Sequence, residues 1–284
     1  MGIVSKRTKT IILTLLVLVV VLLIFTPIIL MIPATFKDKY EIFSYPWTFF
    51  PRNPTLDNFR RIAYLEYTSI AVSFVRSMVI TSLVASLAVV GALVLNMSAA
   101  FAFARLSFPL KKTLWIVMLS TMFIPGITIL ITSVRVVSAL GMIDTLAVLV
   151  LPGLVSAYNI FFFRQFFLGF PKELDEAARI DDASTLSIFR MIYVPMSKTP
   201  MVIIGASVFM GYYNSYLWPT LTITQDRKDL FQIMYVIRML FTDASVLGYG
   251  SVLAATFVSL ILPLAVFMIV QRHIREGIQL SGLK

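Results

Sequence analysis

The sequence contains no cysteine, a single histidine and few charged side chains for its length. Of its 284 residues, 13% are Asp, Glu, Lys or Arg, whereas soluble domains contain about 25%. The absence of cysteine excludes disulfides, thiolate metal sites and a cysteine nucleophile. With 59% hydrophobic residues, the chain has too little polar surface to cover a water-soluble globule. A soluble enzyme is therefore excluded, and a membrane protein is indicated.

The chain is instead rich in long stretches that are free of Asp, Glu, Lys and Arg. There are six of them: residues 10–36, 77–104, 113–134, 145–163, 199–225 and 244–271. A helix rises about 1.5 Å per residue and the hydrocarbon core is about 30 Å thick, so about 20 apolar residues cross it. The backbone in lipid must satisfy its own hydrogen bonds, which favours helices. The sequence therefore predicts an all-α integral membrane protein with six transmembrane helices, at about residues 11–33, 77–104, 113–134, 145–163, 199–222 and 247–271.

The distribution of basic residues predicts the orientation of these spans. An even number of crossings places both termini on one side of the membrane. If that side is cytoplasmic, Arg105, Lys111 and Lys112 lie in one short inner loop and only Arg135 lies in the next outer loop, as the positive-inside rule requires. We therefore expect residues 1–9 to be a cytosolic N-terminus, residues 10–284 to form a single membrane domain, and both termini to be cytoplasmic. The net charge of +10 gathers on no basic face or nucleic-acid motif, so no nucleic-acid partner is expected.

The large inner loop, residues 164–198, has five basic and five acidic side chains. Three acids fall in the opening turns of a predicted short helix, where the helix dipole favours negative charge: Glu173, Asp175 and Glu176. Ser184 or Asp182 can cap a second helix over residues 185–192, and Pro195 is expected to end it. The loop is therefore predicted to form a cytosolic helix-turn-helix hairpin.

The hairpin contains a spaced motif that resembles the coupling loop of bacterial ABC importer permeases. Its residues are Glu176-Ala177-Ala178, three residues, Asp182, nine residues, then Ile192-Tyr193-Val194-Pro195, and the family pattern is E-A-A, three residues, G, nine residues, I-x-L-P. All spacings agree, but Asp182 replaces glycine and Val194 replaces leucine. Aspartate is one of the few residues besides glycine that visit the left-handed conformation, so we expect the turn to be kept. The resemblance implies that seven residues couple the chain to an ATPase subunit: Glu176, Ala177, Ala178, Asp181, Asp182, Ile192 and Pro195.

Other segments are similar to the carbohydrate-uptake branch of this family, particularly the maltose-type second permease subunit. They are residues 54–59, 124–126, 140–145, 214–219, 249–250, 271–273, 276–277 and 282–284. The resemblance implies import of a sugar or oligosaccharide across the bacterial cytoplasmic membrane. It also implies a heterodimer with a second permease, two cytosolic ATPase subunits that use ATP and Mg, and an external solute-binding protein. No cofactor is implied for this chain itself.

Polar and aromatic residues in the fifth run predict a path for the substrate. A buried amide in a bilayer needs a partner, so Asn214 either bonds a neighbouring helix or faces a polar cavity. Aromatic rings can lie on the C–H faces of a sugar, while amides and hydroxyls bond its oxygens. The predicted path consists of Asn214, Tyr213, Tyr212, Tyr216 and Trp218, with helix packing as the alternative role. For Asn96 and Asn159, packing bonds or a gate are expected.

Three other classes of protein are alternatives to a sugar permease: a membrane-embedded enzyme, an ion-coupled transporter and an ABC permease for a non-sugar solute. A membrane-embedded enzyme would need a nucleophile or a metal set, but the runs contain no Asp or Glu and the chain has no H-E-x-x-H or G-x-S-x-G motif, so no catalytic or metal-binding residue is predicted. A transporter coupled to protons or sodium usually needs intramembrane carboxylates. The chain also lacks a P-loop, so ATP hydrolysis must come from a partner. An ABC permease for a non-sugar solute, such as a polyamine or phosphate, stays open as an alternative.

Overall fold

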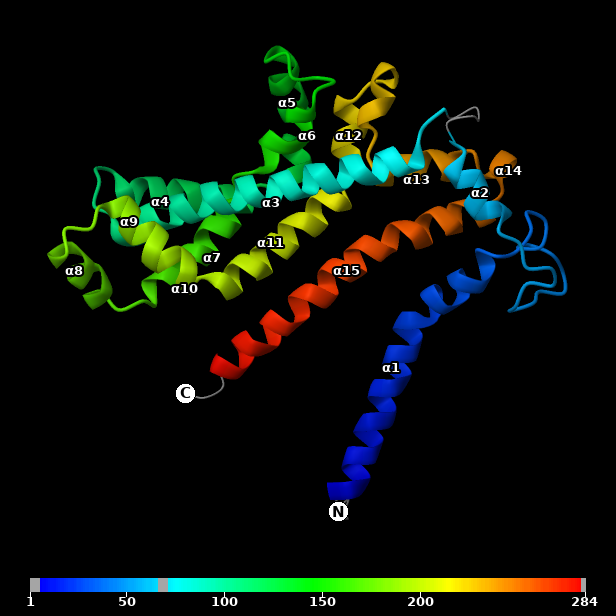
Figure 1. Cartoon of the computed structure of the whole chain (residues 1–284), viewed down its shortest axis with the longest axis horizontal. Coiled ribbons are helices and arrows are strands. Elements are labelled where there is room, and N and C mark those ends of the chain that lie inside the picture. Colours follow the sequence, from blue (N-terminus) through cyan, green and yellow to red (C-terminus); the bar gives the residue numbers. More distant parts are fainter. Residues whose placement is uncertain (1–5, 66–70, 282–284) are drawn as a thin grey trace. The chain divides into compact units, whose positions relative to one another are not determined.

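The computed structural model describes residues 6–65 and 71–281, which belong to two compact units. The first unit comprises residues 1–71 and 237–260, and the second comprises residues 72–236 and 261–284. The described residues contain helices and no β-strand (Figure 1). The predicted all-α class is confirmed.

The helices of the first unit are few. They are α1 (Lys6–Ala34), α2 (Asp57–Ala63), α14 (Ala244–Leu247), and the adjoining parts of α13 (Ile233–Thr242) and α15 (Tyr249–Ser281). The second unit contains most of the remaining elements. They are α3 (Phe74–Arg105), α4 (Lys111–Ser120), η2 (Thr121–Phe123), α5 (Gly126–Ala139), α6 (Leu146–Val150), η3 (Leu151–Gly153), α7 (Ala157–Leu168), α8 (Glu173–Ile180), α9 (Thr185–Ile188), the π-helical η4 (Phe189–Tyr193), α10 (Val194–Met196), α11 (Lys198–Tyr213), α12 (Leu217–Thr222) and η5 (Gln225–Leu230).

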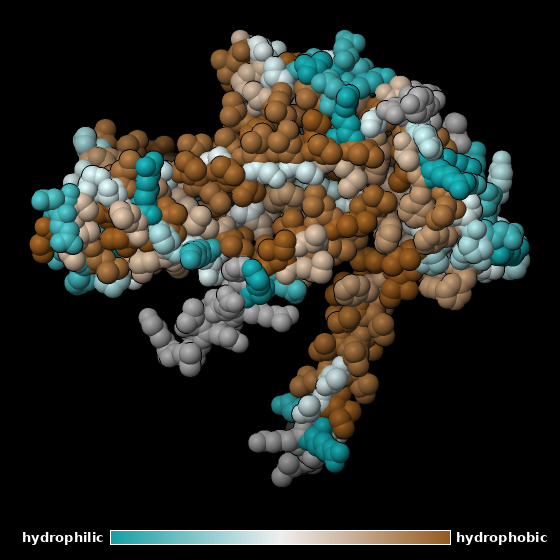
Figure 2. Space-filling model, viewed as in Figure 1, coloured by the Kyte–Doolittle hydropathy of each residue, from teal (hydrophilic) through white to brown (hydrophobic). Residues whose placement is uncertain are grey.

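Three helices are long and apolar enough to cross a membrane without a break. They are Arg7–Ala34, Phe74–Arg105 and Tyr249–Arg272. Figure 2 shows α1 as hydrophobic along its length and polar at its N-terminal end. Its apolar side chains are exposed in the isolated chain, which is the expected state of a helix surrounded by lipid.

The other three predicted spans are not single straight helices, which corrects the expectation from the sequence. The predicted span 113–134 consists of two segments at 106°, 145–163 of two segments at 48°, and 199–222 lies beyond an 80° bend at Ser197. A further break after Tyr213 separates α11 from α12. The first of these breaks has a clear cause, because Pro125 holds Ile124 in an extended conformation and cannot donate a helical hydrogen bond. If each bent pair is one span, the total is six.

In the first unit, a buried amide joins three segments. Asn58 of α2 is 1% exposed, and its Nδ2 donates to the carbonyl oxygens of Thr35 and Lys37, each at 2.8 Å. The hydroxyl of Ser251 on α15 donates to Asn58 Oδ1 at 3.4 Å. A Cβ on Gly250 would lie 2.5 Å from Asn58 Nδ2, so only glycine fits there. The segments 54–59 and 249–250, both singled out in the sequence, therefore contact each other.

In the second unit, α3 is the central helix and packs against α7 and α11. Small side chains on α3 are fully buried, among them Ala85, Ala88 and Ala92. Such residues let helix backbones approach closely in a membrane protein. An apolar cluster at the C-terminal end of α3 joins this helix to α7 and to η4, and it contains Phe101, Phe163, Phe167 and Tyr193 among others.

Candidate functional site

The predicted hairpin is present, formed by α8 followed by the helical segment 185–196. The turn between them is held by Asp182, whose φ is +54°, so the expected left-handed conformation is confirmed. Ser184 is the N-cap of α9, and its Oγ accepts from the N–H of Ser187 at 3.2 Å. The predicted end before Pro195 is wrong, because the helix continues through the π-helical turn η4. Pro195 then stands in the first turn of α10, where its missing N–H is not needed.

The seven predicted coupling residues divide into an exposed set and a set that faces the core. Glu176, Ala177, Asp181, Asp182 and Pro195 are exposed. Ala178 and Ile192 are half-buried and pack against the apolar cluster of the second unit. Three apolar side chains nearby are also exposed, namely Ile180 at 83%, Leu186 at 54% and Met191 at 76%. The hairpin therefore has a mixed acidic and apolar outer face and an apolar inner face.

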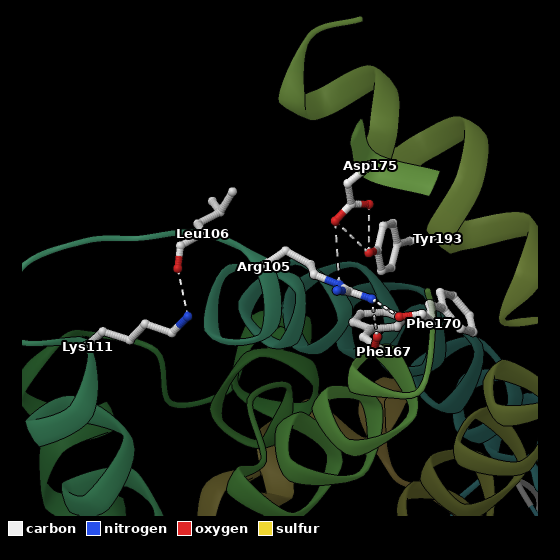
Figure 3. Close-up of polar contacts among 7 residues, drawn as sticks. All are labelled: Arg105, Leu106, Lys111, Phe167, Phe170, Asp175 and Tyr193. Carbon is white, nitrogen blue, oxygen red and sulfur yellow. Dashed lines mark hydrogen bonds and ion pairs between the residues drawn. The ribbon is translucent and has the colours of Figure 1, made fainter. Parts of the chain in front are cut away.

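An ionic cluster that the sequence did not reveal ties this hairpin to the ends of α3 and α7 (Figure 3). The Tyr193 hydroxyl donates to the Asp175 carboxylate, at 2.8 Å from Oδ1 and 3.1 Å from Oδ2. Arg105 Nε lies 3.6 Å from Asp175 Oδ2, and the two side chains are only 7% and 17% exposed. Arg105 Nη2 also donates to the carbonyl oxygens of Phe167 at 2.9 Å and Phe170 at 2.6 Å. One guanidinium thus connects α3, the end of α7 and α8.

The second candidate feature is an uncharged cavity of about 520 Å³ in the second unit. The residues around it come from α5, α6, η3, α7, α11, α12 and the connections between helices, and none of those that line it is Asp, Glu, Lys or Arg. Its polar lining consists of Ser133, Ser156, Tyr158, Asn159, Ser207, Tyr212, Ser215, Trp218 and Gln232. The cavity can therefore offer hydroxyl, amide and aromatic groups to a ligand but no formal charge.

Two residues of this lining have side-chain amides that bond no described residue. Asn159 is 8% exposed and Gln232 is 2% exposed. Both side chains line the cavity, and no described residue forms a hydrogen bond with either side-chain amide. Both amides therefore face the cavity with their donors and acceptors open to a ligand. No motif or periodicity marks Gln232. For Asn159, expected to form a packing bond or a gate, the side chain bonds no described residue, and the gate role stays a prediction.

The five predicted substrate-path residues are only partly brought together. Tyr212 and Trp218 line the cavity, and each is fixed by one bond: the Tyr212 hydroxyl donates to Val150 O and the Trp218 indole N–H to Val148 O, both at 2.8 Å. Tyr213 points elsewhere, because adjacent helical residues face different directions. It is fully buried, with its ring stacked on Phe209.

The other two predicted path residues, Asn214 and Tyr216, also lie outside the lining of the cavity. Asn214 is exposed at the end of α11, where its backbone N–H donates to Met210 O at 3.0 Å. Tyr216 is 43% exposed at the start of α12. Both residues follow the break at the end of α11, and their contact with a substrate stays a prediction.

Asn96 makes the packing bond that was expected of it. Its Nδ2 donates to the carbonyl oxygens of Ala92 at 2.6 Å and Leu154 at 2.7 Å, and its Oδ1 accepts from the N–H of Ser156 at 2.8 Å. Leu154 and Ser156 flank the break between η3 and α7. Asn96 therefore supplies the hydrogen bonds that this break leaves unmade, at the edge of the cavity.

A polar clasp connects the loop before α6 to the loop after α12. The Asp144 carboxylate accepts from Thr224 N at 2.6 Å and from Thr224 Oγ1 at 2.9 Å, and Arg227 Nη1 donates to Asp144 O at 2.6 Å. Arg227 also forms an ion pair with Asp229 at 2.9 Å. The hydrogen bond from Arg227 lowers the pKa of Asp229 below its ordinary value. The clasp fixes the two short helices that frame one end of the cavity.

Comparisons with known proteins place this architecture in a family. Residues 92–279 match the family described as "Binding-protein-dependent transport system inner membrane component". The chain is 32% identical over 266 residues to the sn-glycerol-3-phosphate transport system permease protein UgpE of Escherichia coli O1:K1 / APEC, covering 93% of this chain and 94% of the relative. The UgpE of Salmonella choleraesuis (strain SC-B67) is 31% identical over 265 residues, with the same coverage.

A solved structure has the same fold. It belongs to a bacterial ABC transporter involved in the import of the acidic polysaccharide alginate. The two chains superpose with a TM-score of 0.81 at 19% identity, over 96% of this chain and 99% of the other. Taken with the matched residues and the coupling-loop motif, these likenesses show that the chain belongs to the binding-protein-dependent inner membrane components, the non-catalytic permease subunits of ABC importers.

Proposed function

We propose that this permease forms half of the translocation path for a sugar or oligosaccharide, and that the uncharged cavity is its contribution to that path. The observation that supports this proposal is the pair of amides of Asn159 and Gln232, which face the cavity without a side-chain hydrogen bond to any described residue, in a lining without formal charge. Each amide offers a carbonyl acceptor and two N–H donors, which match the hydroxyl groups of a sugar. A neutral solute rich in hydroxyls therefore fits this chemistry.

The aromatic residues of the cavity support the same substrate class. The Tyr212 hydroxyl and the Trp218 indole N–H each donate a hydrogen bond to a backbone carbonyl of α6. Their rings are thereby held in place as largely apolar surfaces. Such surfaces can lie against the C–H faces of a sugar ring while the neighbouring amides bond its oxygens.

A charged polyol is the second candidate, because the relatives named above are sn-glycerol-3-phosphate permeases. The cavity lining of this chain offers no cation to a phosphate group and no carboxylate to a polyamine. A phosphate would therefore need a basic residue of another subunit. Uptake of labelled maltose-type sugars, glycerol phosphate and a polyamine by the same proteoliposomes distinguishes the three.

The cavity role is tested by Asn159→Leu and Gln232→Leu in the complete reconstituted transporter. A neutral hydrogen bond contributes about 0.5–1.5 kcal/mol, so each variant should weaken apparent affinity by about twofold to 13-fold. Gln165→Leu is the matched control, because Gln165 is exposed on the same helix as Asn159 and is not part of the lining. Unchanged affinity and maximal uptake in both cavity variants would remove the cavity from the path.

As an ABC importer permease, the chain works with an ATPase and a solute-binding protein. We propose that the hairpin lies in the cytosol, with both termini on the same side, and docks in a groove on one of two ATPase subunits. The exposed Glu176 and Ala177, together with the apolar Ile180, Leu186 and Met191, would form the docking face. The remaining partners in this proposal are a second permease that forms a heterodimer with this chain and an external solute-binding protein that delivers the sugar.

Reversing the charge at Glu176 tests this docking. The Glu176→Arg variant should assemble and hydrolyse ATP but lose most solute uptake, since the docking face would repel a basic groove. Glu173→Arg is the control, because it makes the same charge change on the same helix outside the E-A-A motif. Wild-type uptake by Glu176→Arg, or cleavage of the hairpin by protease added outside intact cells, would contradict the proposed role.

A further inference from the structure

Three basic side chains line a smaller cavity of about 240 Å³ in the second unit. Its lining consists of Phe103 near the end of α3, Lys111, Lys112 and Trp115 on α4, and Arg164 on α7. Neither the proposed sugar path nor the hairpin uses these residues. The cavity combines concentrated positive charge with aromatic walls, which is a different chemistry from the uncharged cavity.

No carboxylate among the described residues pairs with the positive charge in this basic cavity. Arg164 Nε donates to Phe103 O at 3.1 Å, and its guanidinium lies 4.1 Å from the centre of the Trp115 ring. Lys111 Nζ donates to Leu106 O at 2.7 Å (Figure 3), and the Arg164 charge repels it. Across the described ranges, Lys111, Lys112 and Arg164 form no ion pair. Arg105, only a few residues away, is by contrast paired with Asp175.

The same three cations leave several donors unused. The two Nη groups of Arg164 and the ammonium of Lys112 have no acceptor among the residues that the structure describes. Lys111 uses one of its three donors on a backbone carbonyl. An anion with several oxygens would satisfy all of them, and arginine is well suited to bind phosphate oxygens in pairs.

The positions of the lining residues in the sequence indicate that the anion comes from the membrane surface. The lining residues lie at the termini of three uncharged runs. Lys112 directly precedes run 113–134, Arg164 directly follows run 145–163, and Phe103 lies in the last turn of run 77–104. The cavity therefore lies at the boundary between the apolar and the polar part of the protein. On α4, Leu114 and Ile116 directly flank Trp115 in the sequence and are 48% and 56% exposed, which leaves apolar surface for an acyl chain.

We propose that the basic cavity binds the phosphate of an anionic phospholipid, with Arg164 and Lys112 as the principal ligands and Lys111 as a third. Basic pockets between transmembrane helices are suited to anionic headgroups, and each cation near the membrane surface strengthens such binding by about fivefold. Trp115 would lie at the level of the headgroup, which is a frequent position for tryptophan. This site depends on the membrane residence of the chain and not on the identity of the transported solute.

The test uses the complete transporter purified with its partner subunits, because a partner subunit that covers the cavity would prevent lipid binding. Native mass spectrometry would follow the binding of phosphatidylglycerol and of phosphatidylcholine with the same acyl chains. Wild-type complex should bind phosphatidylglycerol preferentially, and Arg164→Gln and Lys112→Gln should each weaken it by about fivefold. Lys9→Gln is the control, since it removes an exposed cation outside the cavity. Lys112 is exposed and forms no bond with a described residue, so its variant should fold even if the Arg164 variant does not.

Three results would overturn the proposal. The first is equal binding of phosphatidylglycerol by wild type and by both cavity variants. The second is the absence of any preference for phosphatidylglycerol in the wild-type complex, which would mean that a partner subunit covers the cavity. The third is displacement of the lipid by millimolar inorganic phosphate, with phosphate binding that is lost in Lys112→Gln, which would identify a free anion as the ligand.

Discussion

Replacing Asp175 with asparagine would show whether the cluster of Arg105, Asp175 and Tyr193 holds the hairpin to the membrane helices. Asparagine has nearly the same shape, so its side-chain oxygen can still accept from the Tyr193 hydroxyl. The change removes only the negative charge that faces Arg105. Since the Arg105 side chain is 7% exposed, water cannot readily replace that charge.

The free-energy cost of this substitution depends on which hydrogen bonds remain to Arg105. Removing one partner of a buried ion pair costs about 3–5 kcal/mol, whereas losing one bond to a charged group costs about 1.5–3 kcal/mol. In the Asp175→Asn variant, Arg105 keeps its bonds to the carbonyl oxygens of Phe167 and Phe170. We therefore expect the lower range, which corresponds to about a 12-fold to 150-fold increase in the population with the hairpin detached.

Two measurements would detect this change in the reconstituted transporter. The first is the ratio of solute imported to ATP hydrolysed, which should fall because ATPase movement reaches α3 and α7 less often. The second is hydrogen exchange over residues 173–193, which should become faster. The control is Glu173→Gln, because Glu173 lies in the same first turn of α8, is exposed and forms no bond with a described residue.

The reasoning would be refuted by wild-type coupling and wild-type hydrogen exchange in Asp175→Asn. An equal loss in Glu173→Gln would refute it as well, since the effect would then come from overall charge. A double-mutant cycle with Arg105→Gln separates the pair from its surroundings. If the two changes act through one interaction, the double variant should be little worse than the worse single variant.

Two further predictions concern packing. Asn96→Leu should lower the free energy of unfolding by about 2–4 kcal/mol, because it orphans the buried Leu154 carbonyl and the Ser156 N–H, and a thermal unfolding scan of the purified complex measures this. Gly250→Ala should lower it by about 1–3 kcal/mol, because the added Cβ would lie 2.5 Å from a buried Asn58. Gly211→Ala is its control: a Cβ there meets nothing within 4 Å, so the same scan should show no loss, and equal losses in both glycine variants would contradict the argument.

The sequence predicts the features that depend on local chemistry. Long uncharged runs predicted the helical class and the unbroken helices α1, α3 and α15. The hairpin followed from its acidic first turn and the N-cap Ser184, and the left-handed Asp182 followed from the small set of residues that tolerate that conformation. In each case one short segment contains all the information that the prediction needs.

The features that the sequence missed depend on contacts between distant segments. Arg105 and Asp175 are far apart in the chain, and nothing in either segment marks the other as its partner. The direction of Gln232 depends on how α12 and η5 return toward α11, which no periodicity encodes. The sharp break at Pro125 was locally visible, because proline restricts the residue before it, but counting uncharged residues treats such a break as part of one span.

The placement of these residues on shared helices suggests how the hairpin and the uncharged cavity are connected. On α7, Asn159 lines the cavity and Phe167 accepts from Arg105, eight residues or about 12 Å further along the helix. On α3, Asn96 holds the cavity edge at Leu154 while Arg105 holds the hairpin. A helix moves as a stiff element. A displacement of the Arg105 cluster therefore shifts α3 and α7 together, and with them the parts of the cavity that Asn96 and Asn159 hold. Coupling then requires no separate relay, and substituting two residues of α7 between Asn159 and Phe167 with glycine, which softens the helix without changing its register, should lower the ratio of solute imported to ATP hydrolysed.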